Sequence, residues 1–227
     1  MDEQVLGAMQ KWPNVPAVFG WLSLNAQGDW LLHDNGGARE GQSGEKIANE
    51  QIRNFMNRNY ASTEKGEWFF QNGPQRVFAD LAAAPFIVRL TDDTRNLVTH
   101  SALPVLRISA WVLNEKGQLY LQTEHGAAML AGRDMTLITP RLLVSYPAPA
   151  TNPAATSVKD QELARSANNP EKSAATPLDQ RHLESLEDGK ILQVSLDGNP
   201  AFTAPMQRLD DRQIPQKLAF VRQPATT

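Results

Sequence analysis

The chain carries the sequence GWLSLNAQGDWLL at residues 20–32, and this stretch predicts a strand, a tight turn and a second strand. Gly28 closes the turn because glycine tolerates positive φ angles; one polar residue follows it, and a large apolar run then begins. A second copy, SAWVLNEKGQLYL, occupies residues 109–121 with leucine, asparagine and glycine in register. The glycine-led half recurs once more, as GEWFF, at residues 66–70. The sequence therefore predicts one hairpin motif used in two related β-rich parts of the chain.

These copies predict an α+β protein with two β-rich domains, a duplicated hairpin motif and few short helices. The motif restarts just beyond residues 100–104, so we expect an N-terminal α+β domain at residues 1–100. A C-terminal β-rich domain is expected at residues 101–146 plus 179–222. Between its two parts, residues 147–178 are rich in Ala, Pro, Ser, Thr and Asn and poor in large apolar residues. Such a segment cannot bury enough surface to offset its ordering entropy, which predicts a disordered insertion.

Local patterns refine this outline. Asn49 can cap a helix whose apolar stripe comprises Ile52, Phe55, Met56 and Tyr60, the spacing of one buried helical face. Short strands are expected near residues 135–138 and, as the last element, at residues 218–221. Among the tryptophans, we expect Trp21, Trp30 and Trp68 in the core and Trp12 outside it.

Composition limits the possible functions. The 22 basic and 25 acidic residues are well mixed and give a net charge of −3, so the concentrated basic stripe of nucleic-acid-binding proteins is missing. Cysteine is absent, which excludes disulfides, thiolate metal sites and a cysteine nucleophile. The acidic start and the lack of any run of about 20 apolar residues predict a cytoplasmic protein that binds no membrane. The four histidines lack metal-site spacing, and we expect no metal and no cofactor.

The densest polar group is QNGPQR at residues 71–76. Amides and a guanidinium on a rigid turn offer planar donors to an anionic or carbonyl ligand. We therefore take Asn72, Gln75 and Arg76, together with His100, as candidate ligand-binding residues. The alternative is that Asn72 merely builds the turn, while Arg76 pairs on the surface or serves as a buried structural partner.

Two short motifs are better explained as loop. The glycines of residues 36–41 have the spacing of a phosphate-binding loop, but Gln42 stands where that loop requires a lysine. Ser43 and Lys46 match the Ser-x-x-Lys pattern of penicillin-recognising enzymes, whose other two elements are missing.

The phrases KWPNVP at residues 11–16, FGWL at 19–22 and WFFQNGPQRV at 68–77 resemble a family of proteobacterial proteins of unknown function. This resemblance spans residues 5–146 and resumes at 190–222. The order of parts is more distantly similar to another bacterial family of unknown function, which has two β-rich domains and repeated motifs. That second resemblance implies a similar fold and a binding or signalling role.

We therefore expect a non-catalytic, ligand- or partner-binding protein with a regulatory or signalling role. The first alternative is a small hydrolase or transferase that uses Arg76, His100 and nearby carboxylates; the second is a structural assembly subunit. A cavity gathering the candidate residues would favour a small-molecule site, and convergent carboxylates with shifted pKa values would favour an enzyme. A large exposed apolar patch without a pocket would favour assembly.

Overall fold

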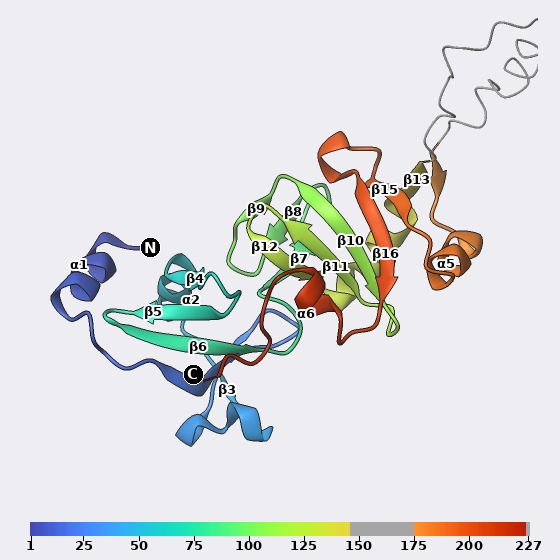
Figure 1. The fold of residues 1–227 in the computed structure, drawn as a ribbon. Helices are drawn as coiled ribbons and strands as arrows, with labels where there is room; N and C mark the ends of the chain where they lie inside the picture. Colours follow the sequence, from blue (N-terminus) through green and yellow to red (C-terminus); the bar gives the residue numbers. More distant parts are fainter. Residues whose placement is uncertain (146–174, 226–227) are drawn as a thin grey trace, which may run out of the picture.

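The structure is a computed structural model that describes residues 1–145 and 175–225. Two β-sheets form the body of the molecule (Figure 1). The smaller sheet has six strands in the order β3-β2-β1-β6-β5-β4. Its strands are β1 (Val18–Leu24), β2 (Trp30–Leu32), β3 (Glu45–Lys46), β4 (Tyr60–Ser62), β5 (Trp68–Asn72) and β6 (Gln75–Leu81). Strands β1 and β6 run parallel and the other pairs are antiparallel, so this sheet is mixed.

The larger sheet has ten strands in the order β14-β13-β15-β16-β10-β11-β12-β7-β8-β9. Its strands are β7 (Phe86–Leu90), β8 (Leu97–Thr99), β9 (Pro104–Val105), β10 (Ile108–Asn114), β11 (Leu119–Thr123), β12 (Gly126–Leu130), β13 (Leu142–Ser145), β14 (Thr176–Pro177), β15 (Leu192–Leu196) and β16 (Ala204–Leu209). It is also mixed, because β10 with β16 and β12 with β7 form parallel pairs.

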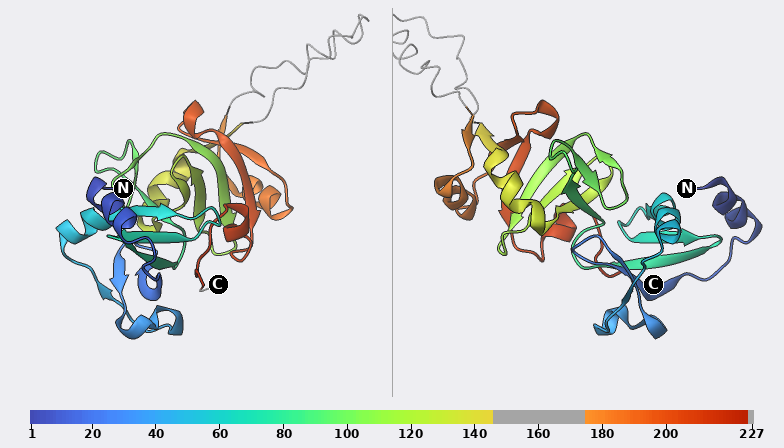
Figure 2. Two further views of the ribbon diagram at one scale, coloured as in Figure 1. Left: turned by 60° about the vertical axis from the view of Figure 1, so that its left-hand side comes forward. Right: turned by 180° about the vertical axis from the view of Figure 1, so that it is seen from behind.

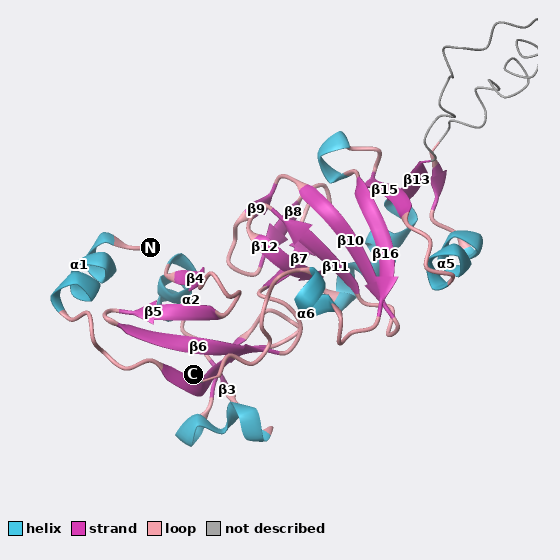
Figure 3. Ribbon diagram, in the orientation of Figure 1, coloured by secondary structure: helices cyan, strands magenta, loops and turns pink. Residues whose placement is uncertain are grey.

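The helices are few and short (Figure 3). They are α1 (Glu3–Lys11), α2 (Glu50–Arg58), α3 (Met135–Ile138), α5 (Gln180–Glu187), α6 (Ile214–Lys217) and the 3-10 helices η1 (Asp34–Glu40), η2 (Gly132–Asp134), η3 (Thr139–Arg141) and η5 (Pro200–Phe202). The expected β-rich fold with few short helices is confirmed. The strand predicted at residues 135–138 is wrong, because these residues form α3. The strand predicted at residues 218–221 is wrong too, because a turn and an irregular segment follow α6 there.

Three of the turns between neighbouring strands have hydrogen bonds in common. In the β1–β2 turn, Asn25 Oδ1 accepts from the backbone N–H groups two and four residues later, at 3.0 and 2.8 Å. In the β10–β11 turn, Asn114 Oδ1 makes the same two bonds, also at 3.0 and 2.8 Å. Thr63 Oγ1 makes the second of these bonds in the β4–β5 turn, at 3.3 Å. Each turn contains a glycine at positive φ: Gly28 (86°), Gly66 (79°) and Gly117 (73°).

Buried apolar side chains of both sheets form one connected core. Trp30 and Trp68 belong to it as predicted, but Trp21 is 43% exposed. Side chains alternate along a strand, and β1 points Leu22 and Leu24 into the core and therefore Trp21 away from it. The prediction for Trp21 is wrong because Leu22 and Leu24 face the core, which places Trp21 on the opposite face of the strand.

Helix α2 begins where the sequence predicts. Asn49 Oδ1 accepts from the backbone N–H of Ile52 at 3.2 Å, which satisfies one of the free donors of the first turn. Met56 is buried beneath the helix, whereas Ile52 is 49% exposed. Only part of the predicted apolar stripe is therefore buried against the sheet.

Strands β7 and β8 lie within the predicted N-terminal domain but pair within the larger sheet. The chain therefore passes from the smaller sheet to the larger one between Leu81 and Phe86. The predicted insertion at residues 147–178 lies mostly outside the described residues. Of its described end, Thr176–Pro177 form β14 against β13. Within residues 1–145 and 175–225, no helix is long and apolar enough to cross a membrane.

The C-terminal segment returns from the larger sheet to the smaller one (Figure 2). The backbone N–H of Val221 donates to the carbonyl of Gly66 at 2.9 Å, and that of Leu81 donates to the carbonyl of Arg222 at 2.8 Å. The Arg222 side chain then reaches the carbonyl of Ala83 at 3.2 Å. These bonds tie the end of the chain to the smaller sheet.

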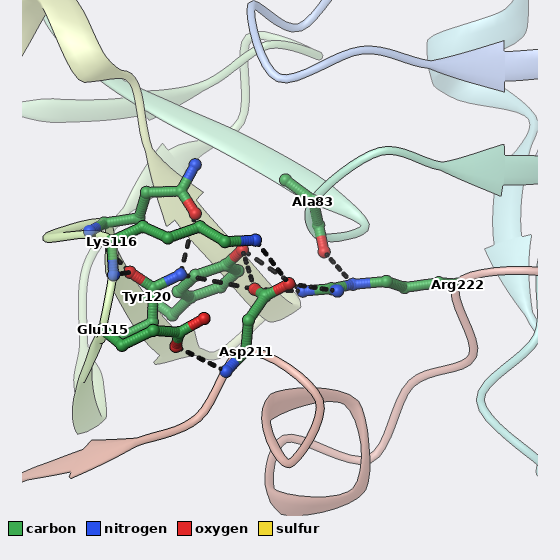
Figure 4. A network of polar contacts seen from close by, with 8 residues as sticks. Ala83, Glu115, Lys116, Tyr120, Asp211 and Arg222 are labelled. Atoms are coloured by element: carbon green, nitrogen blue, oxygen red, sulfur yellow. Dashed lines mark hydrogen bonds and ion pairs between the residues drawn. The ribbon is translucent and has the colours of Figure 1, made fainter.

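A polar network continues from Arg222 into the larger sheet (Figure 4). Arg222 Nη2 donates to the Tyr120 hydroxyl at 3.3 Å, and that hydroxyl donates to Asp211 Oδ1 at 3.3 Å. Lys116 Nζ lies 3.3 Å from Asp211 Oδ2, and Glu115 accepts from the Asp211 backbone N–H at 2.8 Å. The network therefore joins the β10–β11 turn to the returning C-terminal segment.

Candidate functional site

A cavity of about 390 Å³ lies where the two sheets meet, and we call it the interface cavity. The smaller-sheet side of its wall consists of the β1–β2 turn, the end of β3 and one face of α2. The larger-sheet side comes from β7 and from the segments that follow β8 and β12. Neither sheet alone forms the cavity.

Cationic side chains outnumber carboxylates in this wall. The cations are Lys46, Arg53, Arg89 and Arg133, and the carboxylates are Asp29 and Glu50. The whole chain carries a net charge of −3, so the excess of positive charge is local to the cavity. A concave site with an excess of one sign of charge attracts ions of the opposite sign.

Two of the four cations are already engaged. Lys46 Nζ lies 2.7 Å from Asp29 Oδ1. Arg53 Nη1 donates to the backbone carbonyl of Ala48 at 2.6 Å and, more weakly, to that of Ile47 at 3.3 Å. These contacts hold the two side chains in place near the N-terminus of α2.

The other two cations are less restrained. Arg89 has no hydrogen bond or ion pair from its side chain to any residue in the described ranges. Arg133 Nε lies 3.7 Å from Asp134 Oδ1, while Asp134 Oδ2 accepts from the backbone N–H of Leu90 at 2.8 Å. Arg89 and Arg133 therefore have donors left for a ligand.

His100 lies in the wall of the interface cavity, but its ring is enclosed. The ring sits 5.6 Å from the ring of Trp30 and 5.8 Å from that of Phe86. Its Nδ1 accepts from the backbone N–H of Ile87 at 3.3 Å, and its buried Nε2 has no partner among the described residues. Burial, assisted by the positive charge of Arg89, lowers the pKa of His100 to about 3. His100 is therefore neutral at physiological pH and adds no charge to the site.

The β1–β2 turn shapes this cavity directly. Gly28 has a φ of 86°, and a Cβ atom there would lie 2.8 Å from the Cβ of His100. The glycine thus serves two needs, a left-handed turn and a close approach of the two sheets. The indole of Trp30, two residues on, donates to Asn57 Oδ1 at 2.9 Å and fixes that amide in the wall.

The family comparison agrees with the sequence resemblance at a coarse level. A family model described as "Protein of unknown function (DUF2946)" matches residues 1–225. The chain belongs to this family. Membership of a family of unknown function is therefore confirmed; the expected proteobacterial origin stays a prediction.

Two further comparisons add little to this membership. No curated protein matches the chain. A crystal structure of a DUF1285 family protein from Silicibacter pomeroyi DSS-3, at 2.50 Å resolution, is similar to this DUF2946 family member with 13% identity and a TM-score of 0.40. The similarity covers 63% of this chain and 85% of that chain.

The structure separates the predicted site residues of this family member. Asn72 and Gln75 face each other at the β5–β6 turn, and Arg76 follows them. Asn72 lines an apolar groove of about 470 Å³, while Arg76 lines a different cavity of about 400 Å³ beside the half-exposed Trp12. His100 lies in the interface cavity, away from all three. The candidate residues therefore do not converge on one cavity.

The individual contacts of the predicted residues are mostly structural. Gln75 Nε2 donates to the backbone carbonyl of Pro16 at 3.2 Å, which holds the chain before β1 against the hairpin. The Arg76 guanidinium lies over the Phe69 ring, 4.8 Å from its centre, and has no carboxylate partner in the described ranges. Arg76 is thus neither the surface ion pair nor the buried pair weighed from the sequence.

Sequence reasoning missed the cations of the interface cavity. Arg89 lies within the apolar run of β7, and Arg133 follows β12 far along the chain. They come together because β7 and β12 form a parallel pair, with Val88 opposite Leu130. A local sequence pattern does not reveal such a pairing. An arginine within an otherwise apolar strand is unusual, however, and this could have marked Arg89 as a candidate.

Proposed function

We propose that this protein binds a small anionic ligand, one that bears carboxylate or phosphate groups, in the interface cavity. The observation that carries the proposal is the excess of cationic side chains in a cavity of about 390 Å³, a size typical of small-molecule sites. Arg89 and Arg133 supply the planar guanidinium donors that suit such groups. Lys46 and Arg53, held by their own partners, complete the positive side of the wall.

A binding role fits this site better than the hydrolase or transferase that uses Arg76 and His100. Those two residues line different cavities. The Nε2 of the neutral His100 is also buried, so it cannot exchange a proton with a ligand in the cavity. A regulatory or signalling role, in which occupancy of the cavity is the signal, is the function proposed here.

The relation between the two sheets supports such a role. We propose that the β1–β2 and β10–β11 hairpins are copies of one motif in two β-rich domains, because Asn25 and Asn114 make matching turn bonds. The predicted division at residues 1–100 and at 101–146 plus 179–222 then needs one change, the transfer of β7 and β8 to the second domain. A ligand bridging the two domains would favour one arrangement of them over another.

A thermal-shift screen tests the proposal. Pyrophosphate and citrate are compared with uncharged glycerol at matched ionic strength. We expect the anions to raise the melting temperature by about 5–10 °C at 100 times the dissociation constant, since binding then adds about 2.7 kcal/mol. Arg89→Ala and Arg133→Ala should each reduce the shift, whereas Arg107→Ala, an exposed arginine outside the cavity, should retain it. Equal shifts in all three variants would overturn the proposal.

A further inference from the structure

A serine and a histidine meet on the face of the smaller sheet that turns away from its core. Ser23, in β1, alternates with the core residues Leu22 and Leu24, and its side chain therefore lies on the other face. His33 follows β2, and its backbone N–H donates to the carbonyl of Trp21 at 2.9 Å. This backbone bond brings Ser23 Oγ within 2.8 Å of His33 Nε2.

The second nitrogen of the ring determines the direction of that bond. His33 Nδ1 lies 3.1 Å from the backbone carbonyl oxygen of Gln42, which can only accept. Nδ1 therefore carries the proton of the neutral ring, and Nε2 has the lone pair that accepts from the Ser23 hydroxyl. A serine hydroxyl that donates to a histidine held by a third group is the geometry of an activated nucleophile.

The loop of residues 34–44 holds the imidazole in this position. His33 is 5% exposed. A Cβ atom at Gly44 would lie 2.7 Å from Cε1 and Nε2 of the ring, so only glycine lets the backbone pass this close. Ser23 itself is only half-buried, unlike the enclosed ring of His33.

A carboxylate and a guanidinium border the pair. Asp80 stands opposite Ser23 in the parallel register of β1 and β6. Its buried Oδ2 has no hydrogen-bond partner in the described part of the chain, and Arg39 Nε lies 4.0 Å from its Oδ1. Arg39 thus provides a positive charge at the edge of the site, the kind of group that stabilises a developing oxyanion.

We propose that Ser23 is a nucleophile, with His33 as its general base, that hydrolyses a small carboxylic ester. Ser23 Oγ bonds to the ester carbonyl carbon while its proton passes to His33 Nε2. The carbon–oxygen bond to the alcohol then breaks, and that proton leaves with the alcohol. Water, deprotonated by the same Nε2, releases the acid and restores the serine. No residue of the interface cavity takes part, so this activity stands independently of the proposed ligand binding.

An alkyl fluorophosphonate tests the assignment on the full chain. A phosphorus–oxygen bond forms to an activated serine as the phosphorus–fluorine bond breaks, and the modified residue is mapped by mass spectrometry. We expect Ser23 to react at least 100-fold faster than Ser109, an exposed serine of the same protein that serves as the internal control. Ser23→Ala should abolish the fast modification, and His33→Gln should slow it by about 100-fold, the contribution of a general base.

Hydrolysis of p-nitrophenyl acetate gives the second readout. Ser23→Ala and His33→Gln should lose it, and Ser109→Ala should retain it. Modification of Ser23 at the rate of Ser109 in the wild-type protein would overturn the proposal, since it would make the Ser23–His33 bond purely structural. Fast modification that persists in folded His33→Gln protein would overturn the assignment of the base.

Discussion

Asp211 and Arg222 are joined by two parallel hydrogen bonds, each 2.8 Å long, between the two carboxylate oxygens and the two terminal guanidinium nitrogens. The pair lies at the point where the C-terminal segment leaves the larger sheet for the smaller one. Such fork-to-fork geometry is the strong form of an ion pair. The pair therefore helps to hold the returning segment, and its contribution depends on the charge of one carboxylate.

This pair predicts an acid-sensitive stability. Hydrogen bonds from Arg222 hold the pKa of Asp211 far below its ordinary value of 3.8. A carboxyl group whose pKa is lowered by folding contributes stability above its unfolded pKa and loses that contribution as the pH falls below it. We expect Asp211→Asn to cost about 2 kcal/mol at pH 7 and clearly less at pH 2, where the unfolded chain already binds the proton. Urea unfolding at the two pH values measures this, and an equal cost at both would contradict it.

His100 predicts a second pH dependence in a higher range. Its pKa of about 3 lies below the ordinary 6.5, so the unfolded chain binds the extra proton first and stability falls as the pH drops below 6.5. At pH 4.5 the loss should be about 2.7 kcal/mol, from 1.36 kcal/mol per unit. The variant His100→Gln should lack this slope between pH 6.5 and 4.5. An imidazole that titrates near 6.5 in an NMR experiment would show that the ring is not enclosed.

The turn glycines predict two different costs for the same substitution. Gly117→Ala should cost about 1 kcal/mol, because its φ of 73° is unfavourable for alanine but nothing lies within 4 Å of the new Cβ. Gly28→Ala should cost clearly more, since its Cβ would also meet that of His100 at 2.8 Å. Free energies of unfolding from urea titrations give the comparison. Equal costs would mean that the approach of the two sheets at Gly28 is loose.

Arg76 predicts a small effect on stability. It stacks on Phe69 without a carboxylate partner in the described ranges, and an exposed cation–π contact contributes about 0.5–1 kcal/mol. We expect Arg76→Ala to lose about that much and Arg76→Lys to lose less. A loss of ~3–5 kcal/mol would instead indicate an unpaired buried charge, which the structure does not show.

The sequence predicts local structure better than long-range pairing. The turns at Gly28 and Gly117 and the helix cap at Asn49 follow from two to four neighbouring residues, and all three form as expected. The failures have a different origin. Trp21 points away from the core because the adjacent Leu22 faces the core. Strand β7 joins the larger sheet through its pairing with β12, which lies some 40 residues away in the sequence.

The candidate site shows the same limit. The sequence places His100 in a site but cannot show that its ring is enclosed by Trp30 and Phe86. Arg89 and Arg133 carry no motif, and only the parallel pairing of β7 with β12 brings them to one cavity. Ser23 and His33 likewise meet through the β1–β2 hairpin rather than through any recognisable spacing.

Calorimetric titration of pyrophosphate into the wild-type protein and into the double variant Arg89→Ala/Arg133→Ala addresses the interface cavity most directly. Each guanidinium contact to an anion contributes about 1.5–3 kcal/mol, so the double variant should bind at least 100-fold more weakly while its unfolding curve is unchanged. The control Arg107→Ala should bind as the wild type does. Equal affinity in the wild type and the double variant, or no heat of binding in either, would contradict an anion site in this cavity.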